Sequence, residues 1–251
     1  MRRFLAALGF LTIFPLPASL TIGREDHGGS AAYYPLIGLG IGAFLAAMYW
    51  LIGDTLPLLP KTALLVAAMA LVSGGLHMDG LADTFDGLMS HKPRERALEI
   101  MRDSRLGAMG GLAMALVLLT KFSCLAAMDG DVTAWALLLA ATAGRSAMSL
   151  AIVSFPYARA EGLGAPMAGR AGWGTAASAL LVTGLAGAVT GLIVLTIAGF
   201  FMWAAMALWT AMFGFYCKRR LGGMTGDTYG ALCETTETLV LLIVAGYIYG
   251  E

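Results

Sequence analysis

The sequence predicts an all-α protein, a polytopic transmembrane helical bundle of about seven spans with a short N-terminal interfacial helix. Hydrophobic residues make up 59% of the 251 residues and charged residues only 13%, whereas soluble domains usually carry about a quarter charged residues. The 33 glycines suit helices that pack closely in lipid. There is no fixed-period repeat and no low-complexity tract, so residues 1–251 are predicted to form a single integral membrane domain.

The predicted spans follow from apolar stretches of the roughly 20 residues that a membrane-spanning helix needs. They cover 33–52, 58–78, 109–128, 132–154, 174–197, 199–217 and 236–250. The fifth and sixth belong to one long apolar block, which we divide near Gly199. The apolar run at 4–14 resembles a signal peptide, but no small-residue cleavage site follows it cleanly. We therefore expect this run to stay on the protein as the interfacial or re-entrant helix.

The distribution of charge predicts the topology. Counting the spans alternately puts the four long polar segments on one face; they are 15–32, 79–108, 155–173 and 218–235. These segments hold most of the arginines and lysines, while the short connections hold Asp54, Asp129 and Asp131 and only one lysine, Lys61. The positive-inside rule makes the basic face cytoplasmic, with the N-terminus inside and Glu251 outside.

Three aspartates in the segment 73–87 are the first candidate site. Asp79, Asp83 and Asp86 stand at positions i, i+4 and i+7, which share one helix face within about 40–60°. Carboxylates this close repel one another, and a hard divalent cation such as Mg²⁺ would offset the repulsion. Because Mg²⁺ also takes phosphate oxygens, the motif indicates a phosphorylated substrate. A solvated helix end beyond a span is the alternative, but it does not explain acids confined to one stripe.

A second block at 99–107 combines acids and arginines. If it forms one helix, Glu99 and Asp103 lie on one edge with Arg102 and Arg105 beside them. Guanidinium groups bind phosphate through paired hydrogen bonds. The alternative is a network of intrahelical salt bridges with ordinary topology-determining arginines, which we favour for Arg94 and Arg96. We favour a functional role for the residues nearest Gly107, which are Asp103, Ser104 and Arg105.

A third block at 221–237 begins with glycines and continues with acids. Gly223 permits close approach of the backbone to a ligand, and Thr225 stands beside it. If 227–237 is helical, Asp227, Glu234 and Glu237 line one stripe that runs into the last span. The block lacks the Gly-Lys-Ser/Thr ending of a Walker A loop. A glycine-rich turn with a helix cap would explain the glycines but not the three acids.

Two individual residues, His77 and Arg145, each have two possible roles. His77 is either a metal or phosphate ligand or a histidine that packs between helices. Arg145, inside the fourth predicted span, either faces the site or neutralises a buried acid, because an isolated arginine is not viable in lipid.

With these blocks in view, the chain resembles the cobalamin synthase family, the adenosylcobinamide-GDP ribazoletransferases, over nearly its full length. The most specific match is Gly75–Gly87, and the segments 99–107 and 223–227 are also close. The segments 10–17 and 34–38 resemble the family's N-terminal pattern. Met78 and Arg102 depart from it, but both keep the size or charge of the usual residue.

The resemblance implies a transferase that joins adenosylcobinamide-GDP to α-ribazole or its 5′-phosphate and releases GMP, a late step of cobalamin biosynthesis. It also implies a requirement for Mg²⁺ and a place in the bacterial inner membrane with the chemistry facing the cytoplasm. The expected partners are the two substrates and the lipid bilayer. A homo-oligomer, or a complex with other cobalamin-assembly enzymes, is compatible with the sequence, and no nucleic-acid partner is expected.

On this interpretation Asp79, Asp83 and Asp86 bind the metal. Asp103 or Asp227 completes the metal shell or acts as the base, and Arg105 stabilises charge on the leaving GMP. The remaining candidates are expected to contact substrate; they are His77, Arg102, Ser104, Gly223, Thr225, Glu234 and Glu237.

Two other functions share some of these features. A CDP-alcohol phosphotransferase also places spaced aspartates at the end of a span, but its signature continues Asp-Gly-x-x-Ala-Arg, and the arginine is missing after Asp79-Gly80. An ion-coupled transporter would place charges near mid-membrane between paired broken helices, whereas the acids here are predicted to cluster at one face.

Overall fold

The computed structural model describes residues 1–16, 23–159, 172–193 and 198–250. Within these ranges the regular structure is helical, apart from an isolated bridge between Tyr157 and Met224, which confirms the all-α prediction. The elements in order are α1 (Arg2–Leu11), α2 (Arg24–Gly28), η1 (Ser30–Tyr33), α3 (Tyr34–Ile52), α4 (Leu58–Leu71), α5 (Leu76–Met89), α6 (Arg94–Ile100), α7 (Ala108–Ala126), α8 (Gly130–Ser154), α9 (Trp173–Ile193), α10 (Ala198–Leu221) and α11 (Gly226–Tyr249).

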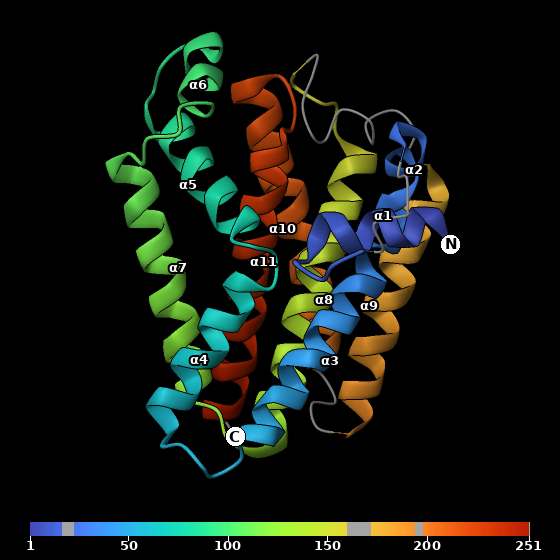
Figure 1. Ribbon diagram of the computed structural model, residues 1–251, viewed down its shortest axis with the longest axis vertical. Helices are drawn as coiled ribbons and strands as arrows, with labels where there is room; N and C mark the ends of the chain where they lie inside the picture. The colour runs from blue at the N-terminus through green and yellow to red at the C-terminus, as the bar shows by residue number, and fades with distance from the viewer. Residues whose placement is uncertain (17–22, 160–171, 194–197, 251) are drawn as a thin grey trace.

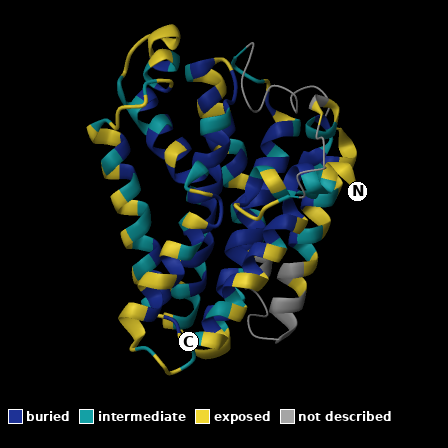
Figure 2. Ribbon diagram, in the orientation of Figure 1, coloured by how far each residue is buried: buried dark blue, intermediate teal, exposed yellow. Residues whose placement is uncertain are grey.

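The long helices run side by side as a bundle, with α8 at its centre (Figure 1). In the apolar stretch of α8, 83% of the residues are buried inside the protein. The outer faces carry exposed large apolar side chains, among them Leu51, Leu119 and Leu208 (Figure 2). Extensive exposed apolar surface of this kind marks a surface that lies against lipid or a partner.

Four helices of the described chain are each long and apolar enough to cross a membrane; they are Ser30–Ile52, Ala108–Ala126, Gly130–Ser154 and Gly226–Tyr249. The pair α4 and α5 gives a fifth candidate if it is counted as one bent span. The chain is therefore a multi-pass membrane protein, while the number seven stays a prediction. Helices α9 and α10 occupy the predicted fifth and sixth ranges, and the division between them falls at 194–197, outside the described residues.

The second predicted span, 58–78, is interrupted. Helix α4 ends at Leu71, α5 begins at Leu76, and the two axes are bent by 79°. Gly74 and Gly75 stand at the break with φ of +64° and +78°, a left-handed conformation that glycine adopts without steric cost. The aspartate-bearing helix therefore starts inside the bundle and runs toward its end, instead of following a complete span (Figure 1).

The arrangement of the connections agrees with the alternation predicted from charge. Figure 1 places α6 and the turn between α10 and α11 at one end of the bundle. The connection between α3 and α4 and the C-terminus lie at the other end. Helix α1 lies across the bundle (Figure 1), with Ala6, Ala7 and Leu11 buried. Its place at a membrane interface, and the identity of the cytoplasmic end, stay predictions. Arg170, one of the basic residues of the predicted polar segment 155–173, lies outside the described residues.

Glycines bring α3 and α8 together. A Cβ added at Gly38 would lie 2.6 Å from the carbonyl oxygen of Ala141, and one added at Gly42 would lie 2.6 Å from Cα of Leu138. Real Cβ atoms do not approach backbone atoms this closely, so the two helices could not pack here with larger residues. Close packing of this kind is a main source of helix association in lipid.

We expect Gly42→Ala to destabilise the protein and Gly40→Ala to leave it unchanged or slightly more stable. Overpacking costs about 1–3 kcal/mol, whereas alanine at an open helix position is favoured over glycine by ~1 kcal/mol. A Cβ at Gly40 would meet no atom within 4 Å, so Gly40→Ala is a matched control two residues away. Thermal unfolding of the purified variants in detergent measures the difference, and equal stabilities would contradict the packing account.

Candidate active site

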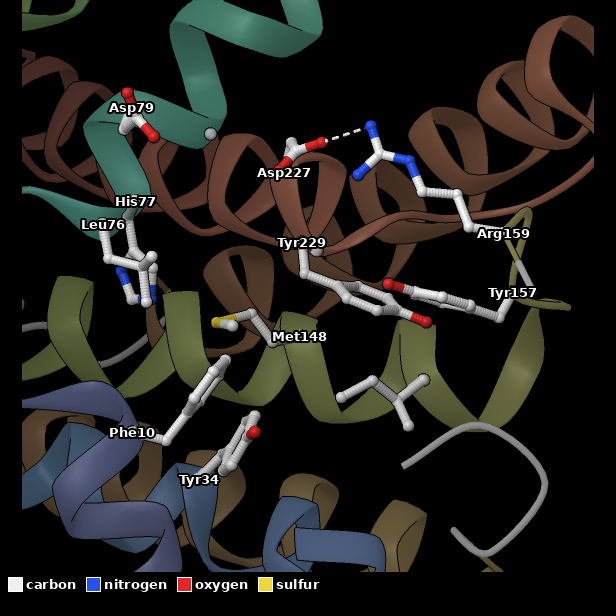
Figure 3. A pocket seen from close by; sticks show the side chains of 13 residues that line it. Phe10, Tyr34, Leu76, His77, Asp79, Met148, Tyr157, Arg159, Asp227 and Tyr229 are labelled. Carbon is white, nitrogen blue, oxygen red and sulfur yellow. Dashed lines mark ion pairs between the residues drawn. The ribbon is translucent and has the colours of Figure 1, made fainter. Parts of the chain in front are cut away.

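A cavity of about 240 Å³ lies where α5, α8 and α11 meet the N-terminal elements (Figure 3). Its walls come from segments far apart in the sequence. The lining residues are Phe10, Tyr34, Leu76, His77, Asp79, Gly80, Met148, Ile152, Tyr157, Arg159, Gly226, Asp227 and Tyr229. The cavity therefore joins the predicted first and third blocks, which the sequence separates by about 150 positions.

The carboxylates gather where α5 and α11 pack tightly. A Cβ added at Gly80 would lie 2.7 Å from the carbonyl oxygen of Asp227, so only glycine allows this approach. Asp79 and Asp83 on α5 and Asp227 in the first turn of α11 are thereby brought together, and the charges of Asp79 and Asp227 act on Asp83. Asp79 is exposed, while Asp83 and Asp227 are partly buried.

Arg159 is the basic partner of this cluster. Its Nη2 lies 2.9 Å from Oδ2 of Asp227, and both side chains line the cavity (Figure 3). In the sequence Arg159 is one of the basic residues of the polar segment 155–173, which we use only to predict the topology. No local spacing links it to Asp227, 68 positions later, and only the folded chain brings the two together.

His77 lies on the cavity wall with 1% of its surface exposed. Neither of its ring nitrogens has a hydrogen-bond partner among the described residues. Buried polar atoms are rarely left unpaired in this way, and each exception calls for an explanation.

Residues 3–245 match the protein family described as cobalamin-5-phosphate synthase. The chain belongs to this family. It is 44% identical to a protein named adenosylcobinamide-GDP ribazoletransferase from Roseiflexus sp. (strain RS-1), over 94% of this chain and 86% of that protein. Relatives of the same name are 39% identical in Geotalea daltonii, over 96% of both chains, and 40% identical in Pseudomonas fluorescens, over 98% of this chain and 99% of that protein. No solved structure matches the chain.

In this family member the segment after α8 is tied to the turn before α11. The backbone N–H of Ala158 donates to the carbonyl of Met224 at 2.7 Å, and Met224 N–H donates to Pro156 at 2.8 Å. A Cβ at Gly223 would collide with the carbonyl of Pro156. The close approach predicted for Gly223 is therefore to this segment, not to a ligand in the cavity. The contact holds Arg159 beside Asp227.

Arg94 strengthens the same junction, and we had favoured only an ordinary topology role for it. Its Nε donates to the carbonyl of Leu221 at 2.7 Å and its Nη2 to that of Ala158 at 3.0 Å. The start of α6 is thereby joined to the end of α10 and to the segment that carries Arg159.

Thr225 is a helix cap. It is fully buried, and its Oγ1 accepts a hydrogen bond from the backbone N–H of Thr228 at 3.2 Å. The hydroxyl of Thr228 in turn accepts from the N–H of Thr225 at 2.7 Å. This reciprocal pair begins α11 and fixes Asp227 in its first turn. Thr225, predicted to contact substrate, does not line the cavity.

Asp86 also has backbone partners. It accepts hydrogen bonds from the N–H groups of Gly107 at 2.7 Å and Gly110 at 2.8 Å, at the start of α7. A carboxylate at a helix N-terminus satisfies donors that the helix leaves unpaired. This placement differs from the metal role that we predicted for Asp86 beside Asp79 and Asp83.

Residues 99–107 do not form one helix, so the condition for the second candidate block is not met. Helix α6 ends at Ile100, and the chain continues as a loop to α7. Because the helix ends at Ile100, Glu99 and Asp103 do not lie on one helix edge. Glu99 instead pairs with Arg96 at 2.7 Å, and Asp103 pairs with Arg105 at 2.6 Å. The anchor of Asp86 to Gly107 is the physical reason, because it fixes where α7 begins.

The loop residues predicted to act in catalysis do not line the cavity. Arg102, Ser104 and Arg105 are exposed, and Asp103 is partly exposed. Hydrogen bonds from the side chain and backbone of Arg105 lower the pKa of Asp103 to about 2. A carboxylate with so low a pKa is a weak base near neutral pH.

Glu234 and Glu237, predicted to contact substrate, instead form ion pairs inside the bundle. Lys121 Nζ lies 2.6 Å from Glu234 and 2.5 Å from Glu237, and Arg145 pairs with Glu237. At most 2% of each side chain is exposed. Arg145 is therefore the partner of a buried acid. The sequence could have predicted that Lys121 has an acidic partner, because a lysine within an apolar span requires one.

The carboxylates around the cavity suit a hard cation. Among the described residues, no group of three or more Asp, Glu, His or Cys side chains lies close enough to surround one ion. Mg²⁺ does not need such a cage, because it commonly binds through one or two carboxylates together with waters and substrate phosphates. Asp79, Asp83 and Asp227 supply oxygen donors only, which fits Mg²⁺ better than softer metals.

Proposed function

We propose that the chain joins adenosylcobinamide-GDP to α-ribazole or its 5′-phosphate, giving adenosylcobalamin or its phosphate and releasing GMP. The relatives in its family carry the name of this activity. The observation that carries the proposal is the junction of α5 and α11, where Asp79 and Asp227 line one cavity and Asp83 lies close enough to be influenced by the charges of both. Oxygen donors beside a cavity are what a phosphoryl-transfer site needs.

In the proposed reaction a ribose hydroxyl oxygen that is free in both α-ribazole and its 5′-phosphate attacks the phosphorus on the corrinoid side of the pyrophosphate. A new P–O bond forms, the bond from that phosphorus to the oxygen of GMP breaks, and the hydroxyl proton passes to a base. Transfers of this kind depend mainly on positioning and on stabilising charge. Both tasks can be performed by side chains that a rigid fold holds at fixed positions.

We assign Asp79 and Asp83, assisted by Asp227, to holding Mg²⁺. When bound, Mg²⁺ would neutralise negative charge on the pyrophosphate oxygens. Asp227 is also our candidate for the base, because it lines the cavity and Arg159 fixes one of its oxygens at 2.9 Å. Asp103 is the weaker candidate, since its pKa is held at about 2. The exposed Arg102 and Arg105 are proposed to meet the GMP portion at the end of the bundle.

We further propose that the chain resides in the bacterial inner membrane with this site open to the cytoplasm. The basic segments support that orientation, because the end of the bundle that carries α6 also carries Lys218, Arg219 and Arg220. A phosphotransferase of phospholipid synthesis and an ion-coupled transporter are not favoured. The break between α4 and α5 is a transporter-like feature, but family membership supports the transferase.

A growth experiment tests the function in cells. A bacterium that lacks its own ribazoletransferase and needs cobalamin is supplied with cobinamide and 5,6-dimethylbenzimidazole, the base of α-ribazole. Expression of this chain is expected to restore growth, while expression of the Asp83→Asn variant is not. No growth despite membrane-inserted wild-type protein would contradict the proposed function.

A further inference from the structure

We infer that the cavity between α5, α8 and α11 is the subsite for the aromatic base of α-ribazole, and that guanine and the corrin ring bind elsewhere. The inference rests on the proposed function and names the substrate that its cavity accepts. It is carried by three features of the cavity: its two unlike ends, its aromatic walls and the unpaired ring of His77.

The two ends of the cavity differ in polarity. Asp79, Asp227 and Arg159 lie at one end, and Phe10 and Tyr34 lie at the other (Figure 3). α-Ribazole has the same polarity, with a largely apolar ring at one end and the ribose hydroxyls at the other. Seating the base at the apolar end would direct the ribose hydroxyls toward the carboxylates, where the proposed reaction requires one of them.

The aromatic side chains form flat walls. The rings of Tyr157 and Tyr229 are stacked with centroids 6.5 Å apart, and those of Phe10 and Tyr34 are stacked at 6.1 Å. Both pairs border the cavity. Aromatic faces favour a planar ligand that can stack on them or meet them edge-on, and a benzimidazole is a planar bicycle.

His77 supplies a single polar contact within these walls. Its ring is 1% exposed, and neither nitrogen has a partner among the described residues. A neutral imidazole offers one N–H donor. The benzimidazole of α-ribazole has one ring nitrogen that is free of the sugar and can accept one hydrogen bond. This ligand would therefore use the donor of His77 without leaving polar atoms of its own unpaired in the cavity.

Guanine and the corrin ring fit the cavity less well. Guanine has several donors and acceptors on its edge, and Leu76, Met148 and Ile152 would leave most of them unpaired; a site built this way rejects such a ligand strongly. The corrin ring is excluded by size. The volume of about 240 Å³ lies below the ~300–1,000 Å³ that is usual for drug-sized ligands, and a corrinoid is larger than these.

An analogue of α-ribazole that lacks one ring nitrogen tests the contact with His77. The full-length protein in detergent is titrated by equilibrium dialysis with α-ribazole and with its indole analogue, in which CH replaces the free ring nitrogen. The wild type is expected to bind α-ribazole about tenfold more tightly than the analogue. His77→Phe is expected to bind both equally. A His77→Phe variant that keeps the tenfold preference would overturn the assignment.

A second pair of variants tests the aromatic wall in case His77→Phe fails to fold. Phe10→Ala is expected to raise the KM for α-ribazole about tenfold and to leave the KM for adenosylcobinamide-GDP unchanged. Phe4→Ala is the matched control, because Phe4 is on the same helix but packs against Tyr33 with centroids 6.0 Å apart. It is expected to change neither KM.

The outcomes separate the subsite from the function. If Phe10→Ala raises the KM for adenosylcobinamide-GDP instead, the subsite assignment fails while the transferase function stands. If the wild type releases no GMP, the proposed function fails, and the dialysis result still decides the subsite because binding requires no turnover. A wild type that binds neither α-ribazole nor its analogue would overturn the subsite assignment.

Discussion

Replacing Asp83 by asparagine is expected to abolish GMP release while leaving the protein folded and inserted in the membrane. Asp83 lies on α5 within the electrostatic influence of Asp79 and Asp227, beside the cavity. Asparagine keeps the size of the side chain and removes its negative charge, so the proposed metal loses a ligand. Stabilisation of this kind is worth several kcal/mol, which predicts a decrease in kcat of about a hundredfold or more.

The control for this variant is Asp131→Asn. Asp131 is exposed in the first turn of α8, on the connection that belongs to the opposite face of the bundle. We expect its substitution to leave both kcat and the thermal unfolding temperature unchanged. Both variants are purified in the same detergent and assayed for GMP. Near-normal turnover by a folded Asp83→Asn variant would remove the metal assignment.

Lys121→Met is expected to cause the largest loss of stability, because it removes one cation from a buried cluster of four charges. Lys121 pairs with Glu234 and Glu237, and among the described residues its removal would leave Glu234 without an ion-pair partner while Arg145 still pairs with Glu237. Removing one partner of a buried ion pair typically costs about 3–5 kcal/mol, since the remaining charge cannot return to water. Thermal unfolding and the yield of monodisperse protein in detergent measure the effect.

A second substitution should reverse much of this loss. Lys121→Met combined with Glu234→Gln restores charge balance and leaves the pair of Arg145 and Glu237 intact. We expect the double variant to be more stable than Lys121→Met alone. Lys218→Met, at an exposed position near the end of α10, should have almost no effect. If Lys121→Met unfolds at the wild-type temperature, the cluster is not a determinant of stability.

The sequence predicted those features that depend on local periodicity. Apolar length placed the long helices, and the spacing of Asp79, Asp83 and Asp86 predicted one helix, which α5 confirms. The condition that 227–237 is helical, under which Asp227, Glu234 and Glu237 share a stripe, is met by α11. These predictions succeed because each depends on contacts within one turn or one span, where the chain sets the distances by itself.

Features that depend on tertiary partners were not predictable. No spacing along the chain pairs Arg159 with Asp227, or Lys121 with the two glutamates, because those distances are set by the packing of whole helices. The helix expected over 99–107 fails for a related reason. Asp86, 21 positions before Gly107, accepts a hydrogen bond from the N–H of Gly107 at the start of α7, and residues 101–107 form a loop between α6 and α7. The two adjacent glycines Gly74 and Gly75 can be read from the sequence, but the 79° bend between α4 and α5 at this point cannot.

The most direct test of the central claim is GMP release by the purified protein. The protein is incubated in detergent with adenosylcobinamide-GDP, α-ribazole and Mg²⁺, and GMP and the cobalamin product are quantified together. We predict equimolar GMP and adenosylcobalamin, loss of both on addition of EDTA, and recovery of both when excess Mg²⁺ is restored. Absence of GMP from a folded, monodisperse preparation with both substrates and Mg²⁺ present would contradict the proposed function.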